Sequence, residues 1–491
     1  MHSIDSESAK KYIEPHLHFA LKQSLYSVDV LEANTLLLYK RLDIAFKLFY
    51  LRLLDNHVPF AEEMYIEHIR AFSLGEFSEP GNTDKNSIEK YMESFYETFL
   101  NIKEHGFDIQ KTLIPISSNK TIINGAHRVS SAIYLNKTVS CIELDCDSPC
   151  YDYKFFYQRN VPIAMIEQAV TTFIEYANNV HIAFLWPIGK STDEQIESLI
   201  PNIVYKKEII LTANGAHNLL SQIYYGEEWL GTVENDFSGS KGKLIECFKN
   251  FDPIKIVAFQ AESLDEVLKI KENVRQTFNV GKHSIHITDT KEEALRTAQI
   301  VFNENSIHFL NYAKPNRYIS THKKIEKFKN FLEKNNLSSE EVLIDSSMTL
   351  SVYGLREAKD IDFFCNSPEK ISIMMDEINE HDEVLLHYSE SKNEIIYNSK
   401  YYFYFNEIKF ISFSQLFKMK TNRAEVKDKN DCKMMEALIE NNQFKSILNQ
   451  YKQKLFYGQI LLRQKIIEIL QKLGIFNVAR KMYRKIKAYD E

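Results

Sequence analysis

The sequence has little glycine, proline and cysteine: 14, 11 and 6 residues in a chain of 491. So few glycines and prolines exclude a collagen-like or linker-rich protein. The six cysteines form no CxxC pair and are sparse for a disulfide-stabilised secreted chain, so we expect reduced thiols and a cytoplasmic protein. Three of them, Cys141, Cys146 and Cys150, lie close together, but buried thiols are favoured over a zinc site because a fourth ligand is missing.

Long apolar runs and an excess of positive charge are also missing. No run of about 18 apolar residues occurs, which argues against a membrane-spanning helix. The N-terminus lacks the basic and apolar segments of a signal peptide. The net charge of −7 gives no general reason to expect nucleic-acid binding. In contrast, 27 tyrosines and 32 phenylalanines can bury a large area, and the length predicts about three domains.

The apolar pattern predicts a multi-domain protein of the α/β and α+β classes. Residues 1–150 combine a helical lead-in over 1–70 with a strand–turn–helix–strand module around the segment NGAHR. Residues 151–315 alternate strands and helices, as expected of a middle α/β domain. Residues 316–445 are predicted to form an α+β domain, and residues 446–491 a basic amphipathic helical tail.

The strongest chemical signal lies in IDSSMTLSVYGLREAKDIDFFCN, residues 344–366. Asp360 and Asp362 are two apart on a strand-like run, so both side chains should lie on one face. Two such carboxylates repel each other unless a cation lies between them, and Mg²⁺ is commonly bound by one or two carboxylates plus phosphate oxygens. Ser346 and Ser347 precede a helix and could bind phosphate there. The alternative is a solvated strand edge, which the apolar neighbours of the pair disfavour.

A hydroxyl-rich turn, a short helix and an Asp-hydrophobic-Asp strand resemble the nucleotidyltransferase (polymerase-β-like) superfamily. The usual turn of that superfamily is Gly-Ser, whereas here it is Ser346-Ser347. The stretch YGLREAKDIDF also looks like the phosphocholine-transferase-like branch found in bacterial surface-polysaccharide loci. The segment FISFSQLFKMKTNRAEVKDKNDCKMMEAL, residues 410–438, is similar to the helix that follows the core in many such proteins.

This resemblance implies roles for further residues. Asp360 and Asp362 would hold Mg²⁺ or Mn²⁺, Ser347 and Arg356 would hold phosphates, and Lys420 and Arg423 would neutralise the developing charge. Lys427 and Asp428 would pack as a pair below them. The third carboxylate of the family lies on a later strand, where this sequence offers Glu407.

The segment TIINGAHRVSSAIYLNK places a tight turn before a helix. Gly125 permits a positive φ, and His127 and Arg128 stand at the positive end of the helix dipole. The pattern resembles the ParB/sulfiredoxin fold over residues 73–145. That resemblance implies that Gly125, His127 and Arg128 contact phosphate and that Glu76 or Glu79 supplies an acid. The alternative is a structural turn with a surface arginine.

Polar residues also interrupt the apolar segments of the middle part. His217 and Asn218 follow a second NGA sequence, and His283 and His286 lie three apart on a predicted strand. The ends of strands in an α/β domain often form a ligand crevice, so we expect a small-molecule or sugar-phosphate pocket there. Satisfied core histidines are the alternative.

From residue 451 to the end, ten basic residues oppose three acidic ones. Apolar and basic residues alternate at helical spacing, which predicts a helix on an anionic membrane surface or, alternatively, a helix packed on the core.

Together these patterns favour a cytoplasmic transferase, peripheral at the inner membrane face, that resembles bacterial capsular polysaccharide biosynthesis proteins. It would use Mg²⁺ to transfer a nucleotidyl or substituted phosphoryl group, from a nucleoside triphosphate or nucleotide-activated donor, to or from a sugar or sugar phosphate. One alternative is an ATP-dependent small-molecule kinase that uses the N-terminal module. Another is a non-enzymatic nucleotide-sensing scaffold.

Overall fold

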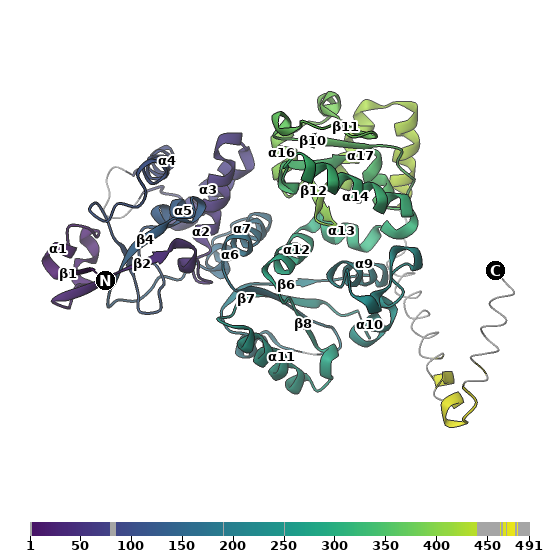
Figure 1. The fold of residues 1–491 in the computed structure, drawn as a ribbon, viewed down its shortest axis with the longest axis horizontal. Helices are drawn as coiled ribbons and strands as arrows, with labels where there is room; N and C mark the ends of the chain where they lie inside the picture. Colours follow the sequence, from purple (N-terminus) through teal and green to yellow (C-terminus); the bar gives the residue numbers. More distant parts are fainter. Residues whose placement is uncertain are drawn as a thin grey trace. The chain divides into compact units, whose positions relative to one another are not determined.

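The computed structural model describes residues 2–78, 85–189, 191–249 and 251–438, with short stretches between 462 and 479 (Figure 1). The chain divides into two compact units, Met1–Asn422 and Arg423–Glu491. Within the described residues, no helix combines the length and apolar character needed to cross a bilayer. In the predicted basic tail, residues 465–467 and 469–472 are helical, whereas most of its basic residues lie outside the described residues.

The first sheet has the strand order β1-β2-β4-β3. Strands β3 and β4 are parallel and joined by α5, the helix that follows NGAHR, whereas the other neighbours are antiparallel. The prediction of a purely helical lead-in is wrong, because β1 and β2 lie within the first 32 residues. The strands are β1 (His2–Asp5), β2 (Leu25–Glu32), β3 (Ile114–Ile116) and β4 (Thr138–Glu143). The helices are α1 (Ser6–Ala9), α2 (Asp43–Leu53), α3 (Pro59–Ser73), α4 (Ile88–His105) and α5 (Ala126–Tyr134).

The second sheet has the order β6-β7-β5-β8, and all of its neighbouring strands are antiparallel. This order and these directions are those of a split βαβ arrangement. Because antiparallel neighbours end at opposite edges, the carboxyl ends of these strands do not all meet at one edge, as they would in a parallel sheet. The strands are β5 (Val180–Leu185), β6 (Ile203–Ile209), β7 (Ile254–Gln260) and β8 (Ile285–Ile287).

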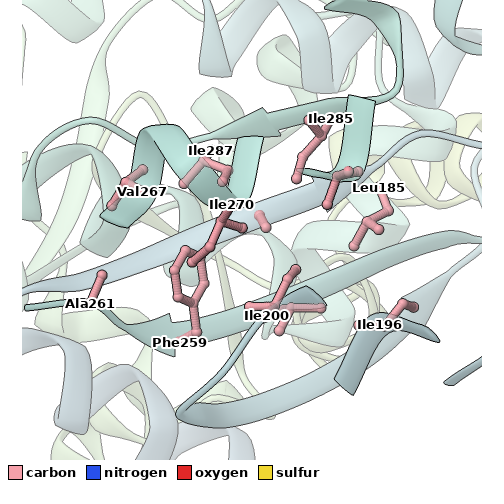
Figure 2. Close-up of a cluster of buried hydrophobic side chains, with 12 residues drawn as sticks. Leu185, Ile196, Ile200, Phe259, Ala261, Val267, Ile270, Ile285 and Ile287 are labelled. Atoms are coloured by element: carbon pink, nitrogen blue, oxygen red, sulfur yellow. The ribbon is translucent and has the colours of Figure 1, made fainter. Parts of the chain in front are cut away.

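Helices α8 and α11 cover one face of this sheet, and α12 contacts β5 from the other face. Figure 2 shows the buried cluster under α8 and α11, in which Ile270 of α11 lies beside Phe259 and Ile196 of α8 lies on the side of Leu185. Each such fully buried side chain stabilises the fold by about 1.5–3 kcal/mol. The helices are α6 (Tyr153–Gln158), α7 (Ile163–Tyr176), α8 (Asp193–Leu199), α9 (Ala213–Ile223), α10 (Ser240–Cys247), α11 (Leu264–Phe278), α12 (Lys291–Val301) and α13 (Glu304–Tyr312).

The third sheet is mixed, with the order β11-β10-β9-β13-β12. Strand β10 carries Asp362 and is paired on both sides, so the solvated-edge interpretation of the carboxylate pair is wrong. Phe363 points to the opposite face, where it packs against Phe328 and Phe331 of α14. The strands are β9 (Val342–Asp345), β10 (Ile361–Cys365), β11 (Ile378–Glu380), β12 (Tyr402–Phe405) and β13 (Ile408–Ile411). The helices are α14 (Ile319–Lys334), α15 (Ser347–Val352), α16 (Lys392–Tyr397) and α17 (Phe413–Arg423).

Candidate functional site

The turn between β9 and α15 has an unusual backbone conformation. Ser346 has φ 55° and ψ −121°, a region that residues with a side chain rarely adopt. A glycine would adopt it without strain, which is the physical reason for the Gly-Ser turn of the resembling superfamily. Strain of this kind costs on the order of 1–3 kcal/mol and concentrates at functional sites.

Asp345, the last residue of β9, lies directly opposite Asp362 in the antiparallel pair of β9 and β10. Opposed residues of such a pair project from the same face, so two carboxylates face each other there. Asp345 is completely buried, and both of its oxygens have partners. The hydroxyl of Tyr388 donates to Oδ1 over 2.6 Å, and Nδ1 of His381 lies 3.2 Å from Oδ2.

The carboxylate of Asp362 has no hydrogen-bond or ion-pair partner in the part of the chain that the structure describes. Burial raises its pKa, and the nearby carboxylates of Asp360 and Asp345 raise it further, whereas His381 acts in the opposite direction. A half-buried carboxylate is costly without a partner. This position therefore favours a cation. Although burial opposes it, Asp345 and Asp362 raise the pKa of His381, so the imidazole supplies part of that charge, and a metal ion would supply the rest.

Asp360 precedes β10 and is linked to the turn, since the hydroxyl of Ser347 donates to its Oδ1 over 3.4 Å. Ser347 is partly exposed, whereas Ser346 is buried and its hydroxyl lies 3.3 Å from Asp345 Oδ2 and 3.5 Å from His381 Nδ1. Of the two predicted phosphate-binding hydroxyls, that of Ser347 is therefore the accessible one. Helix α15 has six residues, so the turn itself, rather than a helix dipole, is what the structure offers to a phosphate.

No group of three or more histidine, cysteine, aspartate or glutamate side chains is arranged to hold a metal ion among the described residues. The two carboxylates of Asp360 and Asp362 fit Mg²⁺ that takes its remaining ligands from phosphate oxygens and water. Glu407 does not supply a third carboxylate. It lies in the turn between β12 and β13, where it pairs with Lys329 at 3.3 Å and Arg296 at 3.7 Å.

The basic residues that were expected to contact phosphate differ in how accessible they are. Lys420 lies buried on α17, so it does not present its ammonium group to solvent. Arg423 does not present an open fork, because Asp428 accepts hydrogen bonds from its Nε and Nη2, each over 2.8 Å. The expected pair of Lys427 and Asp428 is therefore wrong, and Lys427 pairs with Glu425 instead. Arg356 is partly exposed on the loop before β10 and donates to the carbonyl of Glu357 over 3.4 Å.

The NGAHR turn does not have the predicted open geometry. The guanidinium of Arg128 pairs with Glu14 Oε1 at 2.5 Å and also donates to the hydroxyl of Thr112. Gly125 has φ 94°, and a Cβ there would lie 2.8 Å from the Arg128 guanidinium, so the close approach is made by Arg128 and not by a ligand. The expectation of a fork open to phosphate at Arg128 and Gly125 is therefore wrong.

His127 also has structural partners. Its Nε2 lies 3.0 Å from the hydroxyl of Tyr65, and its ring stacks on Phe95 with centroids 4.4 Å apart. Burial lowers the pKa of His127 well below its ordinary value, so the ring is neutral at pH 7 and supplies no charge to a phosphate. Glu76 is exposed on the loop that follows α3, well before the NGAHR turn, and Glu79 lies outside the described residues.

We expect Arg128→Ala to destabilise the protein without changing nucleotide binding. Glu14 would lose its ion pair in a partly buried position, at a cost of about 1–3 kcal/mol. Urea denaturation of Arg128→Ala, Glu14→Ala and the double variant should show a double-mutant coupling between the two residues. Loss of nucleotide binding with unchanged stability would contradict the structural role.

A buried ionic cluster lies next to the same turn. Asp43, at the start of α2, pairs with Arg41 at 2.7 Å and with Lys47 at 3.2 Å, and all three side chains are almost completely buried. Arg41 also donates to the carbonyl of Ile122, which leads into the NGAHR turn. Burial lowers the pKa of Lys47 to about 8, and Asp43 partly offsets this effect. The cluster therefore anchors the turn to α2.

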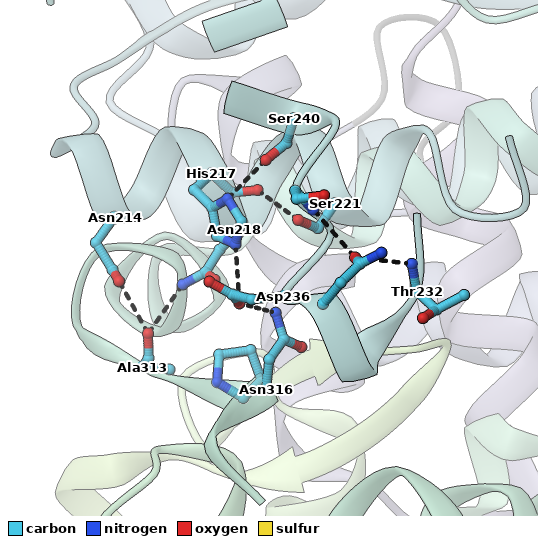
Figure 3. A network of polar contacts seen from close by, with 12 residues as sticks. Asn214, His217, Asn218, Ser221, Thr232, Asp236, Ser240, Ala313 and Asn316 are labelled. Atoms are coloured by element: carbon cyan, nitrogen blue, oxygen red, sulfur yellow. Dashed lines mark hydrogen bonds and ion pairs between the residues drawn. The ribbon is translucent and has the colours of Figure 1, made fainter. Parts of the chain in front are cut away.

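Of the histidines of the middle part, His217 and His286 are satisfied by protein groups. The placement of His283 on a strand is wrong, because it ends the short 3-10 helix Gly281–His283 before β8, and its Nδ1 atom is buried without a hydrogen-bond partner among the described residues. His217 lies 2.7 Å from the hydroxyl of Ser240 and 3.3 Å from Asp236 Oδ1 (Figure 3). This resembles a nucleophile–histidine–carboxylate arrangement, but Ser240 is completely buried and cannot meet a substrate. His286 pairs with Glu293 at 3.2 Å on the face of β8 opposite the Figure 2 cluster. The interpretation of His217 and His286 as core histidines is the one that the structure favours.

The sequence interpretation missed Asp345, His381 and Tyr388, which complete the surroundings of the carboxylate pair. Asp345 could have been found, because it directly precedes the serine turn at a strand end. His381 and Tyr388 follow Asp345 by 36 and 43 residues, and no local spacing links them to it.

Compared with protein-family models, curated proteins and solved structures, the chain has no significant match in any of the three.

Proposed function

We propose that residues 316–445 form a Mg²⁺-dependent transferase that moves a nucleotidyl or substituted phosphoryl group. The observation that carries this proposal is the unpaired carboxylate of Asp362, which faces Asp345 on an internal strand beside Asp360. A structural ion pair would have supplied a basic partner for it. A site that must accept a divalent cation with its substrate leaves such a position open.

Each residue has a separate task in this proposal. Asp360 and Asp362 hold the cation, which neutralises charge on the transferred group when it is bound. The hydroxyl of Ser347 and the backbone of its turn orient phosphate oxygens. Asp345 acts as a positioning residue, because it fixes His381 and contacts the hydroxyl of Ser346. Arg356 is the candidate for a direct phosphate contact from the partly exposed loop.

The sugar substrate and the surface-polysaccharide context rest on the resemblance described above, and the proposed cytoplasmic location rests on the sparse cysteines. The kinase alternative in the N-terminal module is not favoured, because Arg128 and His127 are engaged by protein groups. The scaffold alternative predicts nucleotide binding without turnover.

The test is a thermal-shift panel on the full chain with the common nucleoside triphosphates and nucleotide sugars, each with and without Mg²⁺. We expect one class of nucleotide to raise the melting temperature, and we expect this rise only when the nucleotide and Mg²⁺ are both present. If no nucleotide raises the melting temperature with Mg²⁺, the proposal fails.

The tail leads to a prediction about membranes. At roughly 1 kcal/mol per basic residue near an anionic surface, four contacts would hold the protein there at low salt. We expect the full chain to co-sediment with anionic liposomes and to be released by salt, because the Debye length falls from about 10 Å at 0.1 M to about 3 Å at 1 M. Removal of the residues after 450 should abolish this binding. Equal binding to neutral liposomes would indicate an ordinary packed helix.

A further inference from the structure

A cavity of about 370 Å³ lies where residues 34–40 meet the strand ends of the second sheet. Its size is within the usual range for small-molecule pockets, about 300–1,000 Å³. It shares no residue with the carboxylate site. Most of its polar lining is uncharged: five asparagines, one glutamine, two threonines and one tyrosine. We propose that this cavity binds the sugar units of an uncharged carbohydrate.

Gln260, the last residue of β7, fixes the wall of the cavity. The backbone N–H of Tyr39 donates to its Oε1 over 2.7 Å, and its Nε2 donates to the carbonyl of Leu37 over 3.0 Å. Both halves of the amide are thus used to hold residues 37–39 in place. The cavity is therefore pre-formed, which lowers the cost of ordering it around a ligand.

Other amides of the lining keep hydrogen-bonding capacity. The side chains of Asn34 and Asn178 make no hydrogen bond within the described residues. The Oδ1 atom of Asn34 is itself buried, so its amide nitrogen is the atom that can meet a ligand, whereas Asn178 is exposed. Asn119 uses its Oδ1 to accept from Ser117 and from the N–H of Thr121, which leaves its amide nitrogen available. An amide both donates and accepts, as a sugar hydroxyl does, so the two match without any net charge.

Some of these asparagines have a backbone reason to be present, and others do not. Asn179 and Asn202 have φ 55° and 52°, a conformation that asparagine tolerates well. Asn34 and Asn178 are not among the residues with positive φ. A left-handed backbone conformation therefore does not explain the presence of these two asparagines.

The charges around the cavity disfavour a phosphate-bearing ligand. Lys40 and Glu262 are its charged lining residues, and their charges cancel. A second, charged cavity of about 450 Å³ offers a contrast. There Lys206 and Lys255 both pair with Asp193, at 3.3 and 3.1 Å, so its cations already have partners. The cavity of about 370 Å³ differs from it because its lining offers uncharged amide groups that are not all used in hydrogen bonds within the protein.

The test uses the full chain on an array of neutral and acidic oligosaccharides, followed by calorimetric titration with the best-bound glycan. We expect binding to neutral glycans that needs neither Mg²⁺ nor nucleotide. The double variant Asn34→Ala/Asn178→Ala should bind about tenfold more weakly. The matched control is Asn273→Ala, an exposed asparagine on α11, which should bind as the wild type does.

Binding to no neutral glycan, binding to acidic glycans alone, or unchanged affinity in the double variant would each overturn the proposal. If Asn34→Ala impairs folding, Asn178→Ala alone tests the same cavity at an exposed position without positive φ. Asp362→Asn should keep glycan binding, so failure here and failure of the proposed transfer are distinguishable.

Discussion

Asp362→Asn should reduce Mg²⁺-dependent transfer by about a hundredfold to a thousandfold, the usual cost of removing one charge-stabilising group from an active site. The asparagine keeps the shape of the side chain but removes the charge that would hold the cation. Because burial and the neighbouring carboxylates raise the pKa of Asp362, the same change should increase the free energy of unfolding at pH 7 when no metal is present. Product release from the nucleotide identified by thermal shift measures the first effect, and urea denaturation measures the second.

The matched control is Asp376→Asn, an exposed aspartate on the segment before β11. It should leave both turnover and stability close to those of the wild type. An Asp362→Asn variant that keeps full turnover would exclude the carboxylate pair as the metal site. A loss of turnover accompanied by a loss of stability would instead indicate a structural role for Asp362.

Asp43→Ala should destabilise the protein by about 3–5 kcal/mol, because it leaves Arg41 and Lys47 buried without a counter-charge. Although burial opposes ionisation, Arg41 and Lys47 hold the pKa of Asp43 below its ordinary value of 3.8. A carboxyl group whose pKa is lowered by folding stabilises the fold at any pH above its pKa in the unfolded chain. This contribution is lost as the pH falls through the pKa that the group has in the folded protein. The difference in free energy of unfolding between the wild type and Asp43→Ala should therefore be largest near pH 7 and should become smaller in strong acid.

The control for this change is Asp265→Ala, which removes an exposed aspartate from the first turn of α11, the position that Asp43 occupies in α2. It should cost less than about 1 kcal/mol. The double variant Asp43→Ala/Lys47→Met should recover part of the stability lost in Asp43→Ala, since one unpaired cation is then removed. An Asp43→Ala variant as stable as Asp265→Ala would show that the cluster does not anchor α2 and the NGAHR turn.

The carboxylate pair was predictable from sequence because its signal is local. Period two places Asp360 and Asp362 on one face, and the intervening Ile361 is buried on the other. The serine turn was predictable for the same reason, as it joins a short strand to a helix within a few residues. The alternation of strands and helices in residues 151–315 also follows from local periodicity.

Contacts between distant segments were not predictable in this way. Arg128 finds Glu14 114 residues earlier in the chain, and nothing near NGAHR indicates that partner. The direction of neighbouring strands in the second sheet depends on tertiary packing, so the alternation of strands and helices did not indicate that all of its neighbouring strands are antiparallel. Strand β2 was not predicted, because the segment that follows it has apolar residues at helical spacing and residues 1–70 were therefore interpreted as helical.

The most direct test of the central claim is the position of a divalent cation in crystals of the full chain grown with Mn²⁺ and the nucleotide identified by thermal shift. We expect an anomalous scattering peak between the carboxylates of Asp360 and Asp362, with nucleotide phosphates on the Ser346–Ser347 turn. A peak at another site, or nucleotide bound with no Mn²⁺ between these two carboxylates, would contradict it.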